Sequence, residues 1–273
     1  MDKLHPLYKN HVTLTGNLNA KQTLVFVHGF GTDQTAWQQV IEAFLDDYKI
    51  VLFDNVGAGQ SAPEAFIQHR YLNLRQYADD LLAICAELSL KGIILVGHSV
   101  GGMIGLLATI KAPALASRLI MIGASPRYRN DGDYFGGFSD GDLAQIYSTI
   151  AQHHAEWTDH FAALAMANAD RPYLAEYFAA TLKSIPAKQT LTVLCSIFQS
   201  EHRQDLALVT TPTLLIQSRK DVAVPLAVAQ YLHQHIRDSQ LAIIDAEGHF
   251  PHISAPAEVV ASIRNFLSTT VSP

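Results

Sequence analysis

A serine flanked by glycines stands where two apolar patterns meet. In KGIILVGHSVGGMIGLLA, Lys91–Ala108, a strand-like apolar run precedes small apolar residues typical of a packed helix, and Ser99 lies between Gly97 and Gly101. Gly-x-Ser-x-Gly between a strand and a helix is the pattern of a nucleophile elbow. Side chains at the glycine positions would collide in so tight a turn. We therefore expect Ser99 to be a nucleophile at a helix N-terminus, where developing negative charge is stabilised.

An unassisted serine is a poor nucleophile, so the pattern requires a base and an acid that orients the base. After an elbow these follow in the order acid, then histidine. Asp221 comes soon after the apolar run 213–217, and His249 follows the next run, 241–244. Parallel strands end at the same rim of a sheet. We therefore predict a Ser99, Asp221 and His249 triad.

Neighbouring residues offer alternatives for two of these roles. His252 lies three positions after His249 and is the second choice for the base. Asp245 and Glu247 also lie near the rim, although solvated loop acids are the simpler interpretation of both. His28 is expected to be structural, with its ring bonded to nearby backbone.

The loop after the first predicted strand supplies a further element. It reads His28-Gly-Phe-Gly31, and an oxyanion hole takes one backbone amide from such a loop and one from the residue after the nucleophile. We expect Phe30 and Val100 to be these donors. The glycines also suit a tight turn into a helix capped by Asp33, and both interpretations can hold.

The elements that must position these residues alternate between strand-like and helix-like segments. Short continuous apolar runs between amphipathic segments predict parallel strands buried on both faces and joined by crossover helices. The predicted strands are 23–27, 50–53, 93–96, 118–122, 213–217 and 241–244. The predicted helices are 33–45, 72–88, 99–110, 225–235 and 256–267. This pattern predicts an α/β fold with a mostly parallel central sheet and helices on both faces.

A helical insertion interrupts the alternation between two of the predicted strands. Four helical stretches and no convincing strand occur there, at 140–152, 156–167, 172–184 and 188–199. Ligands bind beyond the carboxyl ends of parallel strands, so a helical insertion there would cover the site as a cap. We predict a core formed by 1–124 and 206–273 and a cap formed by 125–205.

Composition excludes several other classes of protein. The 273 residues are 49% hydrophobic and 16% charged, with a net charge of −6 and scattered Lys and Arg, so nucleic acid is not an expected partner. No apolar segment reaches the ~18–20 residues needed to span a bilayer, and the first residues lack a signal-peptide core. Cys85 and Cys195 lie in apolar helical patterns, as buried reduced thiols do. We expect a cytoplasmic protein without membrane contact.

Two other patterns point only weakly to a cofactor or a metal. Residues 54–59, DNVGAG, lack both the Gly-Lys-Ser/Thr ending of a phosphate loop and the full spacing of a dinucleotide fingerprint. His153, His154 and His160 share no ligand-like spacing with an acidic residue and suit an exposed helix face. We expect neither a cofactor nor a metal.

These motifs, taken together, resemble those of the α/β-hydrolase family from about Leu14 to the end of the chain. A narrower resemblance is to the subgroup of the bacterial stress-response hydrolase RsbQ and its plant relatives, the strigolactone and karrikin receptors. It rests on HGFGTDQTAW (28–37), LFDNVGAGQS (52–61), GHSVGGMIG (97–105), YFGGF (134–138) and GHFPHISAP (248–256). The resemblance implies a mostly parallel sheet, a four-helix cap, and an apolar pocket with Ser99 at its floor.

The aromatic residues supply the candidates for contact with the substrate. Phe30 must face the site if its amide does, and we expect Phe138, Trp157 and Phe198 to line the pocket from the cap. Packing between cap helices is the alternative for each cap aromatic. One departure from the subgroup is Gly102, where bulkier small residues are common, and it bears on the pocket floor or the helix packing.

The expected activity is hydrolysis of small hydrophobic esters or lactones by Ser99, His249 and Asp221 through an acyl-enzyme. A ligand-sensing signalling module with slow or incidental hydrolysis and a protein partner is the alternative, since the receptors of this subgroup keep the same three residues. Cleavage of carbon–carbon bonds by the same triad is a second alternative. A haloalkane dehalogenase is disfavoured, because it needs a carboxylate where Ser99 stands.

Overall fold

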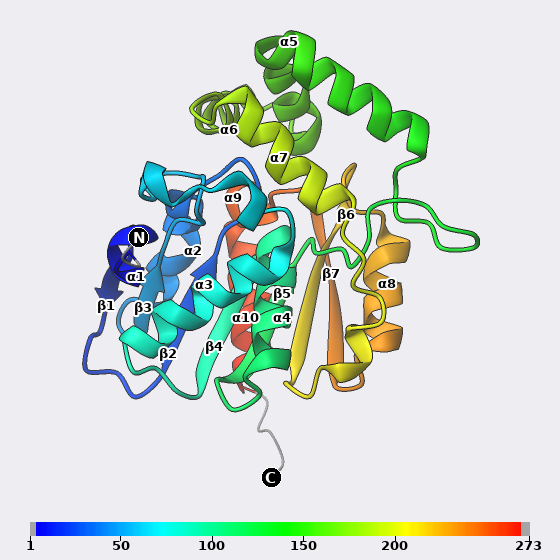
Figure 1. Ribbon diagram of the computed structural model, residues 1–273. Coiled ribbons are helices and arrows are strands. Elements are labelled where there is room, and N and C mark those ends of the chain that lie inside the picture. Colours follow the sequence, from blue (N-terminus) through cyan, green and yellow to red (C-terminus); the bar gives the residue numbers. More distant parts are fainter. Residues whose placement is uncertain (1–3, 269–273) are drawn as a thin grey trace.

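Seven strands form a single sheet in the order β1-β3-β2-β4-β5-β6-β7 (Figure 1). The computed structural model describes residues 4–268. All neighbouring strands pair in parallel except β1, which runs antiparallel to β3. The strands are β1 (Thr13–Gly16), β2 (Thr23–Val27), β3 (Lys49–Leu52), β4 (Ile93–His98), β5 (Ala116–Ile122), β6 (Thr213–Lys220) and β7 (Ser239–Glu247).

The central strands are buried on both faces. Successive residues of β2 alternate between two hydrophobic clusters: Val25 and Val27 belong to the cluster that includes α3 and α4, and Leu24 and Phe26 to the one that includes α10. This double burial explains why the strands are continuous apolar runs rather than alternating ones. The predicted α/β class and mostly parallel sheet are confirmed.

Helices connect the strands and cover both faces. The α-helices are α1 (Pro6–Lys9), α2 (Gln38–Ile41), α3 (Leu74–Glu87), α4 (Val100–Lys111), α5 (Asp140–Met166), α6 (Pro172–Lys183), α7 (Ala187–Phe198), α8 (Leu226–His235), α9 (Pro251–Ser254) and α10 (Pro256–Ser268). Short 3₁₀ segments are η1 (Gln34–Trp37), η2 (Glu42–Phe44), η3 (Pro63–Ala65), η4 (Gln68–Arg70) and η5 (Leu206–Leu208). Among the helices that residues 4–268 form, none is both long and apolar enough to cross a membrane.

Two local predictions differ from the structure. The helix predicted over 33–45 is instead a succession of the short segments η1, α2 and η2. Its apolar side chains Ala36, Trp37, Val40 and Phe44 are nevertheless buried, so the amphipathic pattern holds and only the helix type differs. Strand β1 was not predicted, because its four residues are largely half-exposed at the sheet edge and lack an apolar run.

The insertion between β5 and β6 is helical, and Figure 1 shows α5, α6 and α7 together above one end of the sheet. Helix α5 is interrupted at His153, whose φ of −138° and ψ of 49° are not helical. It therefore consists of two helical segments, and with α6 and α7 the cap contains the four expected. A capping box between Ser139 and Asp142 starts α5. The exact boundaries at 124 and 205 stay a prediction.

Candidate active site

Ser99 occupies a sharp turn between β4 and α4. Its φ of 53° and ψ of −123° are unusual for a residue with a side chain. A Cβ at Gly97 would lie 2.5 Å from the carbonyl carbon of Gly101, and one at Gly101 would lie 2.6 Å from the carbonyl oxygen of His28. Real Cβ atoms do not approach so closely, so both glycines are required by contact with backbone. The expected reason for the Gly-x-Ser-x-Gly pattern is confirmed.

The next glycine, Gly102, serves helix packing rather than the pocket floor. A Cβ at this position would lie 3.0 Å from the Cβ of Ala124 and 3.3 Å from that of Met121. Gly102 is not among the residues that line the cavity described below. Its small size lets α4 approach β5 closely.

Three side chains from distant parts of the chain form a row of hydrogen bonds. His249 Nε2 lies 2.8 Å from Ser99 Oγ, and His249 Nδ1 lies 2.9 Å from Asp221 Oδ2. The neutral imidazole that satisfies both contacts donates from Nδ1 to the carboxylate and accepts the serine proton at Nε2. Side chains of His249 and Asp221 are only 5% and 1% exposed, so water does not compete for these bonds. Sequence reasoning named all three residues, and the structure brings them together.

The carboxylate of Asp221 is held on both oxygens. Oδ1 accepts hydrogen bonds from the amides of Ala223 and Val224, at 2.8 and 3.0 Å. Oδ2 accepts from Gln217 Nε2 at 3.1 Å in addition to His249. Hydrogen bonds of this kind hold a carboxylate in one orientation. Asp221 is therefore preorganised to orient the imidazole.

The two alternative acids point elsewhere. Asp245 pairs with Arg219, at 3.1 Å, and its side chain is exposed. Glu247 pairs with Lys220, also at the surface. Each is thus a solvated surface acid with a lysine or arginine partner, as its simpler interpretation predicted.

His252, the alternative base, lies in a buried group of rings. Its ring packs at a tilt against those of Trp37 and His98, with centroids 4.5 and 4.2 Å away. Neither of its nitrogens has a hydrogen-bond partner among residues 4–268. Burial, together with the nearby His249 and His28, lowers the pKa of His252 to about 3, so its ring is neutral. It therefore makes no hydrogen bond to Ser99 or Asp221 and has a packing role instead.

The loop that carries His249 is fixed by the cap and by β4. The His249 amide donates to Ala165 O in α5 at 2.7 Å, and the His249 carbonyl is 2.7 Å from His98 Nε2. Gly248 has a φ of 88°, and a Cβ there would lie 2.8 Å from the carbonyl carbon of Met166. The base therefore depends on contacts with α5 as well as on its own strand.

Both predicted oxyanion donors border one cavity. Phe30 follows β2, and Val100 opens α4, where the first amides of a helix have no partner within the helix. Behind Phe30, His28 Nε2 accepts from the Asn55 amide at 2.9 Å, and its Nδ1 lies 2.8 Å from Gly29 O. Burial lowers the pKa of His28, which keeps this ring neutral. His28 thus supports the loop, as expected, and the donor roles of Phe30 and Val100 stay a prediction.

The cavity beside these donors is apolar and narrow. Apart from backbone, His28 and Asn55, its walls are mainly apolar side chains: the aromatic Phe30 and Tyr77 and the aliphatic Val56, Leu74, Val100, Ile104, Ile185, Val193 and Ile197. The volume open to the centres of water molecules is about 30 Å³, which holds roughly two waters. A larger ligand must therefore displace side chains or cap helices to enter.

Of the four predicted pocket aromatics, only Phe30 lines this cavity. Phe198 packs against Phe138, with ring centroids 5.1 Å apart, and edge-on against Tyr128 at 5.6 Å. Trp157 stacks on Phe161 at 5.0 Å within the cap. Packing between cap elements accounts for the present positions of Phe138, Trp157 and Phe198, and their contact with substrate stays a prediction.

Sequence reasoning missed one residue that contacts the serine. The Tyr128 hydroxyl lies 3.2 Å from Ser99 Oγ. Tyr128 is in an irregular loop after β5, where neither apolar periodicity nor a motif marks a position near the site. Only the YFGGF motif nearby pointed to this loop.

No metal centre competes with this interpretation in the described chain. Within residues 4–268, no three His, Cys, Asp or Glu side chains gather closely enough to hold a metal ion. The chemistry that the triad supports is proton transfer and nucleophilic attack by a serine.

Comparison with known proteins agrees with this geometry. The family model described as "alpha/beta hydrolase fold" matches residues 22–256, which is most of the chain. The chain belongs to the α/β-hydrolase fold family. This α/β hydrolase is 42% identical to the karrikin insensitive 2 receptor CA of Petunia hybrida, over 89% of this chain and 90% of the relative.

Two further similarities extend the comparison. The strigolactone esterase D14 of Arabidopsis thaliana is also 42% identical, over 89% of this chain and 91% of that protein. Among solved structures, a hydrolase from Oleispira antarctica superimposes with a TM-score of 0.93 at 30% identity and covers 97% of both chains. The expected relation to the plant strigolactone and karrikin receptors is therefore confirmed.

Proposed function

We propose that this α/β hydrolase is a serine esterase that cleaves small hydrophobic esters or lactones. The observation that carries the proposal is the unbroken, buried row from Ser99 Oγ through His249 to Asp221. An exposed serine without a base is unreactive, whereas this arrangement supplies a proton acceptor at 2.8 Å. Relatives named esterases support the same reaction class.

The proposed reaction has two steps. Ser99 Oγ attacks the carbonyl carbon while its proton passes to His249 Nε2, and the amides of Phe30 and Val100 hold the oxyanion. The protonated His249 then gives its proton to the leaving oxygen, which leaves an acyl-enzyme. A water molecule, deprotonated by His249, releases the acid and restores Ser99. Asp221 accepts a hydrogen bond from His249 Nδ1 throughout, whether the imidazole is neutral or protonated.

The substrate class follows from the shape and chemistry of the cavity. Its mainly apolar walls provide no charged side chain to pair with an ionic substrate. Its narrowness favours a short acyl or lactone group next to Phe30 and Val100, with any larger part admitted by movement of the cap. A small apolar carbonyl compound is the best match.

The test uses p-nitrophenyl acetate and a series of γ- and δ-lactones with three proteins. Wild type should turn over the ester, and Ser99→Ala should lose turnover and labelling by a fluorophosphonate. Ser218→Ala is the matched control, because it removes another buried serine hydroxyl, one with no hydrogen-bond partner among residues 4–268. Equal labelling of wild type and Ser99→Ala would overturn the proposal.

Ligand sensing is a second candidate function, because a relative named as a receptor is 42% identical over nearly the whole chain. A receptor needs ligand-dependent movement more than fast turnover, and the narrow cavity requires movement of side chains or cap. Enzymes typically turn over at about 1–1000 s⁻¹. Lactone turnover far below this range, with lasting changes in hydrogen exchange of α5–α7, would favour a sensor.

A further inference from the structure

A buried phenol contacts the proposed nucleophile from outside the triad. Tyr128 is 4% exposed, and its hydroxyl is 3.2 Å from Ser99 Oγ. Because the serine proton is directed to His249 Nε2, Ser99 Oγ has only lone pairs to offer Tyr128. The phenol is therefore the donor. Burial raises the pKa of Tyr128 above its ordinary value, so the donor proton is retained at neutral pH.

Tyr128 and Phe30, the proposed oxyanion donor, come from opposite sides of the nucleophile. Strand β4, which leads to Ser99, lies between β2 and β5 in the sheet. Phe30 follows β2, whereas Tyr128 follows β5. Tyr128 therefore contacts the serine oxygen itself, whereas the amides of Phe30 and Val100 bind the oxyanion of the substrate in the proposed reaction.

We propose that Tyr128 is a further catalytic residue, whose hydroxyl donates a hydrogen bond to Ser99 Oγ while that oxygen carries negative charge. This inference rests on the proposed hydrolase function. During attack, the Oγ–H bond breaks toward His249 Nε2 as the Oγ–carbon bond forms, and the Tyr128 proton stays on the phenol. During release of the acyl group, the Oγ–carbon bond breaks, and Oγ takes the proton back from His249. Tyr128 stabilises Oγ in both steps.

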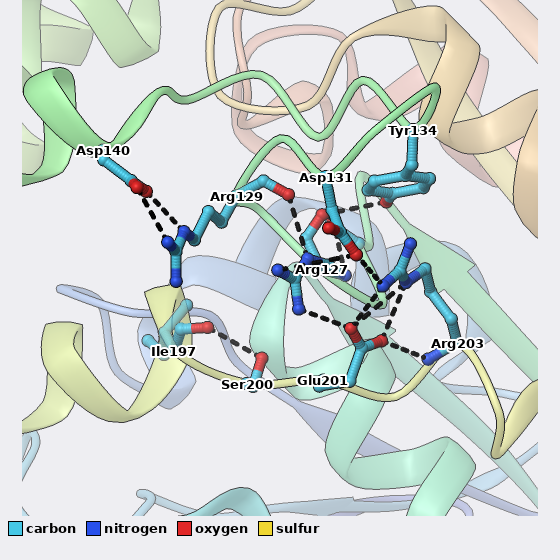
Figure 2. A network of polar contacts seen from close by, with 10 residues as sticks. Arg127, Arg129, Asp131, Tyr134, Asp140, Ile197, Ser200, Glu201 and Arg203 are labelled. Atoms are coloured by element: carbon cyan, nitrogen blue, oxygen red, sulfur yellow. Dashed lines mark hydrogen bonds and ion pairs between the residues drawn. The ribbon is translucent and has the colours of Figure 1, made fainter.

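An ionic cluster at the base of the cap positions Tyr128. We call Arg127, Asp131, Glu201 and Arg203 the hinge cluster, because they join the two segments that connect the core to the cap (Figure 2). Glu201 pairs with Arg127 and, at 2.7 Å, with Arg203. Arg203 also pairs with Asp131 at 2.5 Å. The residue just before Tyr128 is thereby tied to the segment after α7.

The pKa of Glu201 agrees with strong pairing inside the hinge cluster. Partial burial would raise it, but hydrogen bonds and charge from Arg203 and the charge of Arg127 lower it to about 2. The side chains of Arg127 and Arg203 are only 16% and 22% exposed, so water screens these pairs incompletely. Glu201 is therefore ionised at neutral pH and pairs with both arginines.

The main chain around Tyr128 is held as well. Phe138 N donates to Tyr128 O at 3.1 Å, and a Cβ at Gly136 would lie 2.6 Å from the same oxygen. The Tyr134 hydroxyl donates to Arg127 O at 2.8 Å, and Arg203 lies over the Tyr134 ring (Figure 2). Side chain, backbone and hinge cluster together leave the phenol little freedom to leave Ser99.

Replacing Tyr128 with phenylalanine tests the hydrogen bond while keeping the ring that packs against Phe198. Because Tyr128→Phe removes a hydrogen bond to a charged atom, we expect kcat to fall by about 10- to 100-fold. We expect KM and the melting temperature to change little. Labelling by a fluorophosphonate should slow by a similar factor. The control Tyr231→Phe removes the hydroxyl of another tyrosine, on α8, and should retain wild-type kcat. A kcat for Tyr128→Phe within twofold of wild type would overturn the inference.

A double-mutant cycle tests whether the hinge cluster acts through Tyr128. Glu201→Gln should lower kcat by about 3- to 10-fold in the wild-type background and leave it unchanged in Tyr128→Phe. The control Asp79→Asn breaks an ion pair with Lys111 on the core surface and should have no effect in either background. Equal losses from Glu201→Gln in both backgrounds would show that the cluster does not work through the phenol.

The Ser99→Ala variant separates this inference from the proposed function. If Ser99→Ala is inactive while Tyr128→Phe is fully active, only the role of Tyr128 is wrong. If Ser99→Ala keeps wild-type activity, the hydrolase mechanism itself is wrong, and the inference falls with it.

Discussion

Gly101 contacts the backbone at the start of the loop that carries Phe30. A side chain at Gly101 should therefore disturb the nucleophile elbow and lower activity. In Gly101→Ala, the new Cβ would lie 2.6 Å from His28 O, and the carbonyl oxygen of Val27 would be closer still. Because real Cβ atoms stay at least 3.0 Å from such atoms, α4 and the end of β2 must separate by 0.4 Å or more. Neither partner is a flexible side chain, so backbone has to move.

This displacement moves residues of the proposed catalytic site. Ser99 is two residues before Gly101, and Phe30 is two residues after His28. Misplacement by about 1 Å costs roughly 100-fold in rate, so a shift of half that size or more should lower kcat/KM by about 10- to 100-fold. Overpacking typically costs about 1–3 kcal/mol, and the better helix propensity of alanine offsets up to about 1 kcal/mol of it. We expect a net loss of stability of about 1–2 kcal/mol.

Gly105→Ala is the matched control in the same helix. Its Cβ would have one close neighbour, Leu119 Cδ1 at 3.2 Å, which is the end of a flexible side chain. This variant should keep wild-type kcat/KM and unfold within about 1 kcal/mol of wild type. The assays are p-nitrophenyl acetate kinetics and urea unfolding followed by circular dichroism. Wild-type kinetics and an unchanged urea midpoint for Gly101→Ala would refute the reasoning.

Three other predictions follow from the site and its surroundings. Asp221→Asn should lower kcat by about 10⁴-fold with little change in melting temperature, because an amide in place of the carboxylate favours the wrong imidazole tautomer; a loss below tenfold in steady-state assays would contradict this. His252 has a folded pKa of about 3 and an unfolded value near 6.5, so the unfolded chain binds the extra proton between these values. Stability should therefore fall as pH drops from 6.5 toward 3, by up to about 1.4 kcal/mol per pH unit from this group, and urea unfolding of His252→Phe should show a shallower slope. Burial raises the pKa of Cys85 to about 12, so iodoacetamide at pH 8 should label it only in urea; labelling of the native protein, read by mass spectrometry, would be inconsistent with that burial.

Much of the fold is predictable from local patterns. Strands β2, β4 and β5 are continuous apolar runs, because each is buried on both faces, and this pattern is visible without coordinates. The elbow glycines are also visible, because only glycine fits against the neighbouring backbone. Strand β1 and the division of residues 34–44 into short 3₁₀ and α segments were not predictable. Pairing at a sheet edge and the choice of helix type depend on neighbours distant in sequence.

The sequence by itself determined the order of the catalytic residues along the chain: a serine in its elbow, then an acid after one strand and a histidine after the next. Tertiary structure decided between His249 and the alternative base His252, because contacts with α5 and β4 fix the loop that carries His249. It also placed Tyr128 against Ser99 and turned Phe138, Trp157 and Phe198 toward one another or the cap. Irregular loops and helix faces take their directions from contacts far along the chain, and no local pattern encodes those contacts.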